Sequence, residues 1–127
     1  MVGVLSESGS DDQRAFQSFA DFWPFYVREH AQAATRRAHF VGTSLALLIL
    51  LAALLMGRWR WLVAVPVCGY ALAWYSHFMI EKNRPATFKY PLWSLLGDLK
   101  MWRLMATGRM GPEIERILGQ PDSTPAD

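Results

Sequence analysis

Charged side chains are missing from two long stretches of this chain. No Asp, Glu, Lys or Arg occurs in residues 38–56 or in residues 61–80 of the 127. Each stretch is close to the roughly 20 residues that a helix needs to cross the hydrocarbon core of a membrane. A soluble protein of this length could not cover two helices that are apolar on every side. The sequence therefore predicts two transmembrane helices rather than a buried helical pair.

Cysteine is scarce as well, since Cys68 is the only one and lies inside the second stretch. An internal disulfide and a cysteine metal cluster are thereby excluded. The chain also has no glycine-rich phosphate loop and no serine nucleophile elbow. Its net charge of +2, without a basic stripe, indicates no nucleic-acid partner. The acidic first residues do not resemble a cleaved signal peptide, so the first span is expected to act as its own insertion signal.

A short turn, residues 57–60, joins the two spans, which predicts a tight antiparallel hairpin. Basic residues gather before the first span and after the second, while the turn carries only Arg58 and Arg60. By the positive-inside rule, both termini are expected in the cytoplasm. Arginine greatly exceeds lysine in the composition, which favours a GC-rich bacterium and hence its inner membrane.

The segments beside the hairpin have helical periodicity. Aromatic residues in 14–32 and leucines in 92–108 each line one helical face, which is typical of amphipathic helices at a membrane interface. Residues 1–12 and 120–127 contain too little apolar surface to offset the entropy of ordering, so both are expected to be disordered. The predicted fold is all-α: an integral membrane helical hairpin in a single domain, 13–119, with flanking interfacial helices.

Two of the three histidines lie near the open end of the predicted hairpin. In an antiparallel hairpin with this turn, residues at equal depth have numbers that sum to about 117. His39 and His77 satisfy this relation to within one residue. Imidazole is the commonest protein ligand for transition metals, and an ionisable group in a span is a functional hypothesis by default. One interpretation is a shared metal site, and the other is two separate interfacial histidines.

Glu81 and His30 are further candidates for this site. Glu81 follows His77 by four residues on the same helical face, so it either serves the metal site or pairs with an arginine at the interface. On an unbroken helix, His30 and His39 would lie on opposite faces about 13 Å apart. They could share an ion only if the chain bends within "AQAATRR", whose composition favours a continuous helix.

Polar residues also follow the second span. Arg84 would suit a fatty carboxylate or a lipid phosphate because a guanidinium forms two parallel hydrogen bonds with such groups. Snorkelling to lipid headgroups is the alternative. Asn83, Tyr90 and Tyr26 are further candidates for substrate contact. Asp98 is either an acid that faces the site or the polar edge of an amphipathic helix.

The segments "FYVREHAQAATRRAHFVGT" and "GYALAWYSHFMIEKNRPATFKYPLWSLLGDLKM" resemble, over about residues 16–110, a small membrane family whose characterised fungal members are 2-hydroxy fatty acid dioxygenases. The resemblance implies an iron(II)-dependent α-oxidation in which a 2-hydroxy fatty acid and dioxygen give a chain one carbon shorter. It implies that His30, His39 and His77 hold the iron. Glu81 would be a ligand or an orienting group, and Arg84 would neutralise the substrate carboxylate.

Fungal members have more predicted spans than this chain, so a homo-oligomer would complete the acyl-chain pocket. Two other functions remain open. His39 and His77 could ligate a haem from both sides, which would make the protein an electron carrier. Alternatively, the hairpin is not an enzyme and binds lipid or supports another membrane protein.

Overall fold

The computed structural model describes residues 16–119, and this part of the chain is helical without a strand. The all-α prediction is confirmed there, whereas the predicted disordered segments 1–12 and 120–127 lie outside the described residues. The α-helices are α2 (Phe19–Glu29), α3 (Ala33–Met56), α4 (Ala64–Ser76), α5 (Pro91–Ala106) and α6 (Met110–Leu118). The shorter helical segments are η1 (Trp59–Val63), η2 (His77–Glu81) and η3 (Ala86–Phe88).

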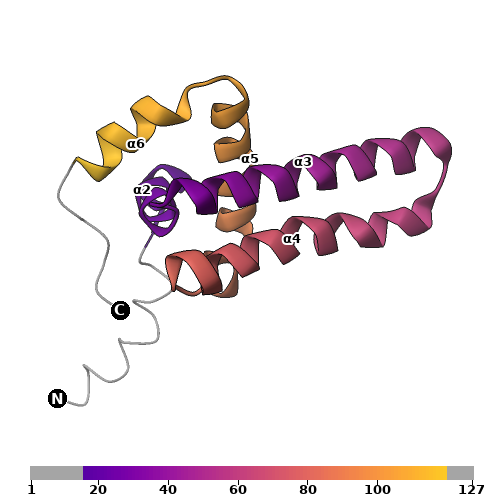
Figure 1. Ribbon diagram of the computed structural model, residues 1–127, viewed down its shortest axis with the longest axis horizontal. Coiled ribbons are helices and arrows are strands. Elements are labelled where there is room, and N and C mark those ends of the chain that lie inside the picture. Colours follow the sequence, from indigo (N-terminus) through magenta and orange to yellow (C-terminus); the bar gives the residue numbers. More distant parts are fainter. Residues whose placement is uncertain (1–15, 120–127) are drawn as a thin grey trace, which may run out of the picture.

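The predicted hairpin is present. Helix α3 runs antiparallel to the continuous helical stretch η1–α4–η2, and the two extend together away from the other helices (Figure 1). Gly57 ends α3 with a φ of 65°, a left-handed conformation that glycine adopts without strain. At Gly42 a Cβ atom would stand 3.2 Å from the carbonyl oxygens of Cys68 and Gly69. This small residue therefore lets the two helix backbones approach closely.

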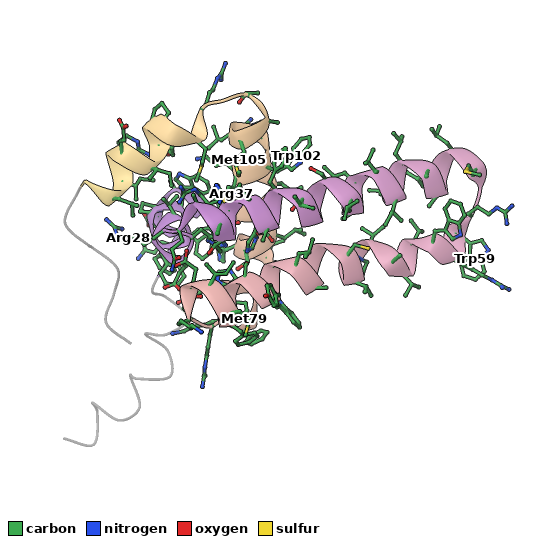
Figure 2. The ribbon with its side chains drawn as sticks, in the orientation of Figure 1. Arg28, Arg37, Trp59, Met79, Trp102 and Met105 are labelled. Atoms are coloured by element: carbon green, nitrogen blue, oxygen red, sulfur yellow. The ribbon has the colours of Figure 1, made fainter. Side chains whose placement is uncertain are left out.

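Both hairpin helices are long and apolar enough to cross a membrane, with mean hydropathies of 2.2 and 1.3 over their most apolar windows. Only 22% and 17% of the residues in those windows are buried. Their side chains point outward along the hairpin, with Trp59 at its closed end (Figure 2). The paired core helices of a soluble protein would be mostly buried. This exposure favours membrane insertion, which remains a prediction.

The remaining helices gather at the open end of the hairpin. Helix α5 crosses the hairpin instead of running along it, and α6 returns beside α2 (Figure 1). The aromatic face of α2 is buried in this cluster, with Phe22 0% and Trp23 2% exposed. Trp23 Nε1 donates to Glu113 of α6 at 2.7 Å. The face that the sequence assigns to a membrane interface therefore packs against other helices of the same chain.

Helix α5 shows the opposite arrangement. Its leucine stripe is exposed, and the stripe consists of Leu92, Leu95, Leu96 and Leu99. The buried face carries small and polar residues, Ser94 and Gly97, together with Met101. Trp102 Nε1 donates to Ser44 Oγ of α3 at 2.9 Å, which joins α5 to the hairpin. The polar face of α5 is thereby turned toward the histidines, while the interfacial position of the leucines remains a prediction.

Candidate metal centre

The helix is interrupted between α2 and α3, at the point where the composition favours a continuous helix. His30 ends α2 with φ −121° and ψ 42°, and Gln32 is extended with φ −86° and ψ 136°. Arg36 Nη1 donates to the carbonyl oxygens of His30 at 2.8 Å and Ala31 at 2.7 Å. A carboxylate oxygen of Glu81 accepts from the Gln32 N–H at 2.6 Å. These side chains satisfy backbone groups that a helix break leaves unpaired, so no glycine or proline is required.

This break brings all three histidines together. The Nε2 atoms of His30 and His39 are 3.2 Å apart, those of His39 and His77 are 3.2 Å apart, and those of His77 and His30 are 3.0 Å apart. The three side chains come from the end of α2, from α3 and from the start of η2, and all are buried. The equal depth of His39 and His77 that the hairpin register predicts is therefore confirmed.

The outer nitrogen of each ring has an oxygen partner. His30 Nδ1 donates to the carbonyl oxygen of Tyr26 at 2.6 Å. His77 Nδ1 donates to Asn83 Oδ1 at 2.7 Å, and His39 Nδ1 lies 3.4 Å from Asp98 Oδ1. The oxygens beside His30 and His77 only accept hydrogen bonds, so the protons of these two rings belong on Nδ1, and the Asp98 carboxylate favours the same tautomer of His39. Each Nε2 then presents a lone pair to the centre, which is the arrangement found in metal-binding histidines.

The orientation of the Asn83 amide follows from its second partner. Its Nδ2 donates to the backbone carbonyl oxygen of Glu29 at 3.1 Å. A carbonyl oxygen can only accept, so the nitrogen of the amide must face Glu29 and the oxygen must face His77. The protonated nitrogen of the His77 ring is thereby determined by a residue of α2.

Three inward lone pairs repel one another in a buried site, and there is no ring proton that they could share. Burial, followed by the neighbouring His39 and His77, lowers the pKa of His30 well below its usual 6.5. A cation bound at the centre would remove the repulsion. Nitrogens that lie about 2.0–2.1 Å from one metal ion, at ligand angles of about 90–110°, are about 2.8–3.4 Å apart. The observed 3.0–3.2 Å fits a small transition metal with positions left open for other ligands.

The aromatic ring of Tyr26 packs against the imidazole of His30. Tyr26 stacks on its imidazole with ring centroids 4.0 Å apart, and the Tyr26 hydroxyl donates to Asp98. Burial and the nearby Asp98 raise the pKa of Tyr26 well above its usual 10.0, so the hydroxyl stays protonated and donates. Asp98 thus contacts both Tyr26 and His39. Asp98 therefore faces the histidines, which is the first of the two interpretations that the sequence left open.

The histidine on the second hairpin helix begins a turn of π-helix. Segment η2 widens the helix over His77–Glu81, and Lys82 follows with a φ of 61°. The Asn83 N–H then donates to the His77 carbonyl oxygen at 3.0 Å. After the wide turn the backbone reverses direction at Lys82, so that the Asn83 side chain contacts the His77 ring. Single π turns of this kind occur frequently at functional sites.

A small cavity adjoins the three histidines. Its further lining includes Ala73 and Trp74 of α4, Thr87 of η3, and Ser94 and Asp98 of α5. Trp74 is 36% exposed and Thr87 is partly exposed, whereas Ser94 is 2% exposed. Among the lining residues, those on α4 and η3 thus include side chains that reach the surface. The exposed aromatic side chains of Phe78 and Phe88 lie next to Trp74, since Phe88 contacts both Trp74 and Phe78.

The other residues that the sequence suggests have different surroundings. Glu81 contacts Gln32 and does not belong to the histidine cluster of the described residues. Arg84 is exposed and is not part of the cavity lining. Tyr90 packs against Phe16 and other residues of the aromatic core. Asn83 contacts a histidine, and Tyr26 both contacts a histidine and lines the cavity.

The sequence did not indicate a role at this site for three residues: Gln32, Arg36 and Ser94. For Ser94 a signal exists, because Ser94 and Asp98 are four residues apart and share one face of a helix whose other face is rich in leucine. Gln32 and Arg36 had no such signal. Their contacts depend on the break between α2 and α3, which the local composition does not predict.

The fold and the site define a class of protein: a helical hairpin with a buried three-histidine centre at its open end. A family model described as "Mpo1-like: 2-hydroxy-palmitic acid dioxygenase Mpo1-like" matches residues 16–110. This chain belongs to the Mpo1-like family, as its sequence motifs indicate. The matched residues include all three histidines and the whole of α2 to α5. A search of curated proteins and a search of solved structures each found no match.

Proposed function

We propose that this protein is a membrane-bound iron(II)-dependent dioxygenase that shortens 2-hydroxy fatty acids by one carbon. The observation that carries the proposal is the convergence of three buried Nε2 atoms, 3.0–3.2 Å apart, whose rings are each held from outside through Nδ1. Histidine ligation with open positions suits non-haem iron(II) that activates dioxygen. The family description supplies the substrate class.

The proposed reaction balances without an external reductant. A 2-hydroxy acid and one dioxygen molecule give the acid shorter by one carbon, carbon dioxide and water. The bond between C1 and C2 breaks, and the two carbons together lose the four electrons that reduce dioxygen. Bound iron would supply the activation of dioxygen and a Lewis acid for the oxygens of the substrate.

The residues of the chain have distinct tasks in this scheme. His30, His39 and His77 would hold the iron. Asp98 and Asn83 would keep the rings of His39 and His77 in the correct tautomer, and a ligand held in this way is a stronger base. Glu81 would act as a positioning residue, because its contact with Gln32 holds the bend that presents His30.

Exposed aromatic side chains offer a path for the apolar tail of the substrate. Trp74, which lines the cavity, and its neighbours Phe78 and Phe88 expose apolar surface. If the hairpin lies in a membrane, this surface faces lipid tails, and an acyl chain can approach from within the bilayer. Arg84 is exposed and lies beyond the end of the second span. It would attract the carboxylate of an approaching fatty acid at the cytoplasmic surface.

The haem alternative fits the geometry less well. Two axial ligands about 2.0 Å from a haem iron lie on opposite faces of the macrocycle, about 4 Å apart. His39 and His77 are closer than this, and His30 occupies the space beside them. The arrangement favours a mononuclear metal site over a haem.

Metal content and product formation test the proposal together. The protein is purified in detergent after expression with iron, and its metals are measured by elemental analysis with a visible spectrum. We expect about one iron per chain without a Soret band, and pentadecanoic acid from 2-hydroxypalmitic acid and dioxygen. His77→Ala should lose both the iron and the product, because one of three ligands is removed.

Ser76→Ala is the matched control, since Ser76 is equally buried and its hydroxyl donates to the Ala73 carbonyl oxygen instead of facing the histidines. This variant should keep its iron. An absence of metal in the native protein, or full retention in His77→Ala, would contradict the proposal. A lipid-binding or scaffold function would then be the better explanation.

A further inference from the structure

Ser94 has a buried hydroxyl without a protein partner. Its side chain is 2% exposed, and Oγ forms no hydrogen bond within residues 16–119. A buried polar group that lacks a partner is costly, whereas alanine would fill nearly the same space without that penalty. The hydroxyl of Ser94 is thus free to bind a partner that does not belong to the described residues.

The location of Ser94 indicates what that partner is. Ser94 lines the cavity beside the three histidines, together with Asp98, which lies four residues later on the same face of α5. The carboxylate of Asp98 is already engaged by Tyr26 and lies near His39. The hydroxyl of Ser94 thus remains available to a molecule that occupies the cavity.

We infer that Ser94 is a substrate-binding residue that hydrogen-bonds an oxygen of the head of a bound 2-hydroxy acid. This inference rests on the proposed function and extends it to substrate recognition. A 2-hydroxy acid between the histidines and α5 would be bound from two sides. The metal site would bind oxygens of the acid on one side, and Ser94 Oγ would donate a hydrogen bond from the other. A site that pairs a polar group with substrate discriminates against analogues that lack the matching oxygen.

The test is a binding measurement with two fatty acids. Native protein and Ser94→Ala, both loaded with iron under anaerobic conditions, are titrated with 2-hydroxypalmitic acid and with palmitic acid. We expect Ser94→Ala to bind 2-hydroxypalmitic acid about tenfold more weakly than the native protein does. If only the hydroxy acid is affected, Ser94 contacts the 2-hydroxyl; if both acids are affected equally, it contacts the carboxylate. Either result supports the inference.

A second readout separates this role from a structural one. Ser94→Ala should keep the native iron content, and its melting temperature without ligand should not fall, because the lost hydroxyl has no protein partner. Thr35→Val is the control, since Thr35 is fully buried and its hydroxyl also lacks a partner in the described part of the chain, but it does not line the cavity. This variant should bind both acids as the native protein does.

Two failures are distinguishable. Unchanged binding of both acids by Ser94→Ala, with a native protein that binds the hydroxy acid, would overturn the role of Ser94 alone. A native protein that holds iron but binds neither acid would instead contradict the proposed function and, with it, this inference.

Discussion

Gly97 of α5 lies directly against the ring of Tyr26. A Cβ atom at Gly97 would stand 2.7 Å from Cδ2 and 2.8 Å from Cε2 of that ring, which is closer than such atoms pack. The ring of Tyr26 in turn stacks on His30, and its hydroxyl binds Asp98. The absence of a side chain at position 97 therefore determines how closely α5 approaches the histidine centre.

Gly97→Ala should displace Tyr26 and disturb the centre. We expect a loss of about 1–3 kcal/mol in the free energy of unfolding, because the ring is fully buried and can move only by displacing its neighbours. Iron affinity should fall as well, since His30 loses the surface on which it rests. Thermal unfolding in detergent and competition with a metal chelator measure the two effects. Gly111→Ala is the control, because nothing lies within 4 Å of a Cβ at that position.

Asp98→Asn tests the contact with His39. The amide retains the shape of the carboxylate but removes the charge that holds the proton on His39 Nδ1. Loss of such an outer partner typically weakens metal binding about 10–100-fold, and we expect iron affinity to fall within that range. Asp21→Asn, an exposed residue in the first turn of α2, should leave it unchanged. Equal iron affinity in native protein and Asp98→Asn would argue against an orienting role.

Glu81→Gln separates a metal ligand from a residue that holds the bend. The amide oxygen of glutamine can still accept from the Gln32 N–H, so iron should be retained at the native ratio. Stability should fall by about 1 kcal/mol, because a charge-assisted hydrogen bond becomes a neutral one. Elemental analysis beside His77→Ala gives the comparison. Loss of iron as complete as in His77→Ala would instead place Glu81 among the ligands.

Acid should weaken the hydrogen bonds of Glu113, which link it to Arg116 within α6 and to Trp23 of α2. Its hydrogen bond from Arg116, and to a smaller extent that from Trp23, lowers the pKa of Glu113 below its usual 4.5 despite the opposing effect of burial. The unfolded chain therefore binds the proton first as the pH falls, and stability decreases from about pH 4.5 down through the lowered pKa. Above that range the stabilisation is fully present.

Glu113→Gln removes this titration. The stability difference between native protein and the variant should shrink as the pH falls from about 5 to about 3. Melting temperatures over that range provide the measurement, with Glu115→Gln, an exposed residue of the same helix, as the control. A difference that is constant with pH would show that the charge of Glu113 does not contribute to the stability of the protein.

The amino-acid sequence by itself determined the hairpin and the equal depth of two histidines within it. The charge-free stretches have the length of membrane spans, and a short turn leaves only one antiparallel register. Residues at equal depth then follow by arithmetic, which places His39 and His77 at the same level of the hairpin. In the structure their Nε2 atoms lie 3.2 Å apart. Family membership was also readable, because the motifs around the histidines are contiguous in the chain.

Only the tertiary structure determined that the third histidine, His30, reaches the other two. The local composition favours helix through residues 31–37, and local propensity amounts to less than about 1 kcal/mol per residue for all residues but proline. Hydrogen bonds from Arg36 and to Glu81, the latter distant in sequence, outweigh that preference and break the helix at His30. Long-range contacts also decided that the aromatic face of α2 is buried and that the polar face of α5 points inward. Periodicity can identify a helical face, but only the packing of the other helices determines what that face contacts.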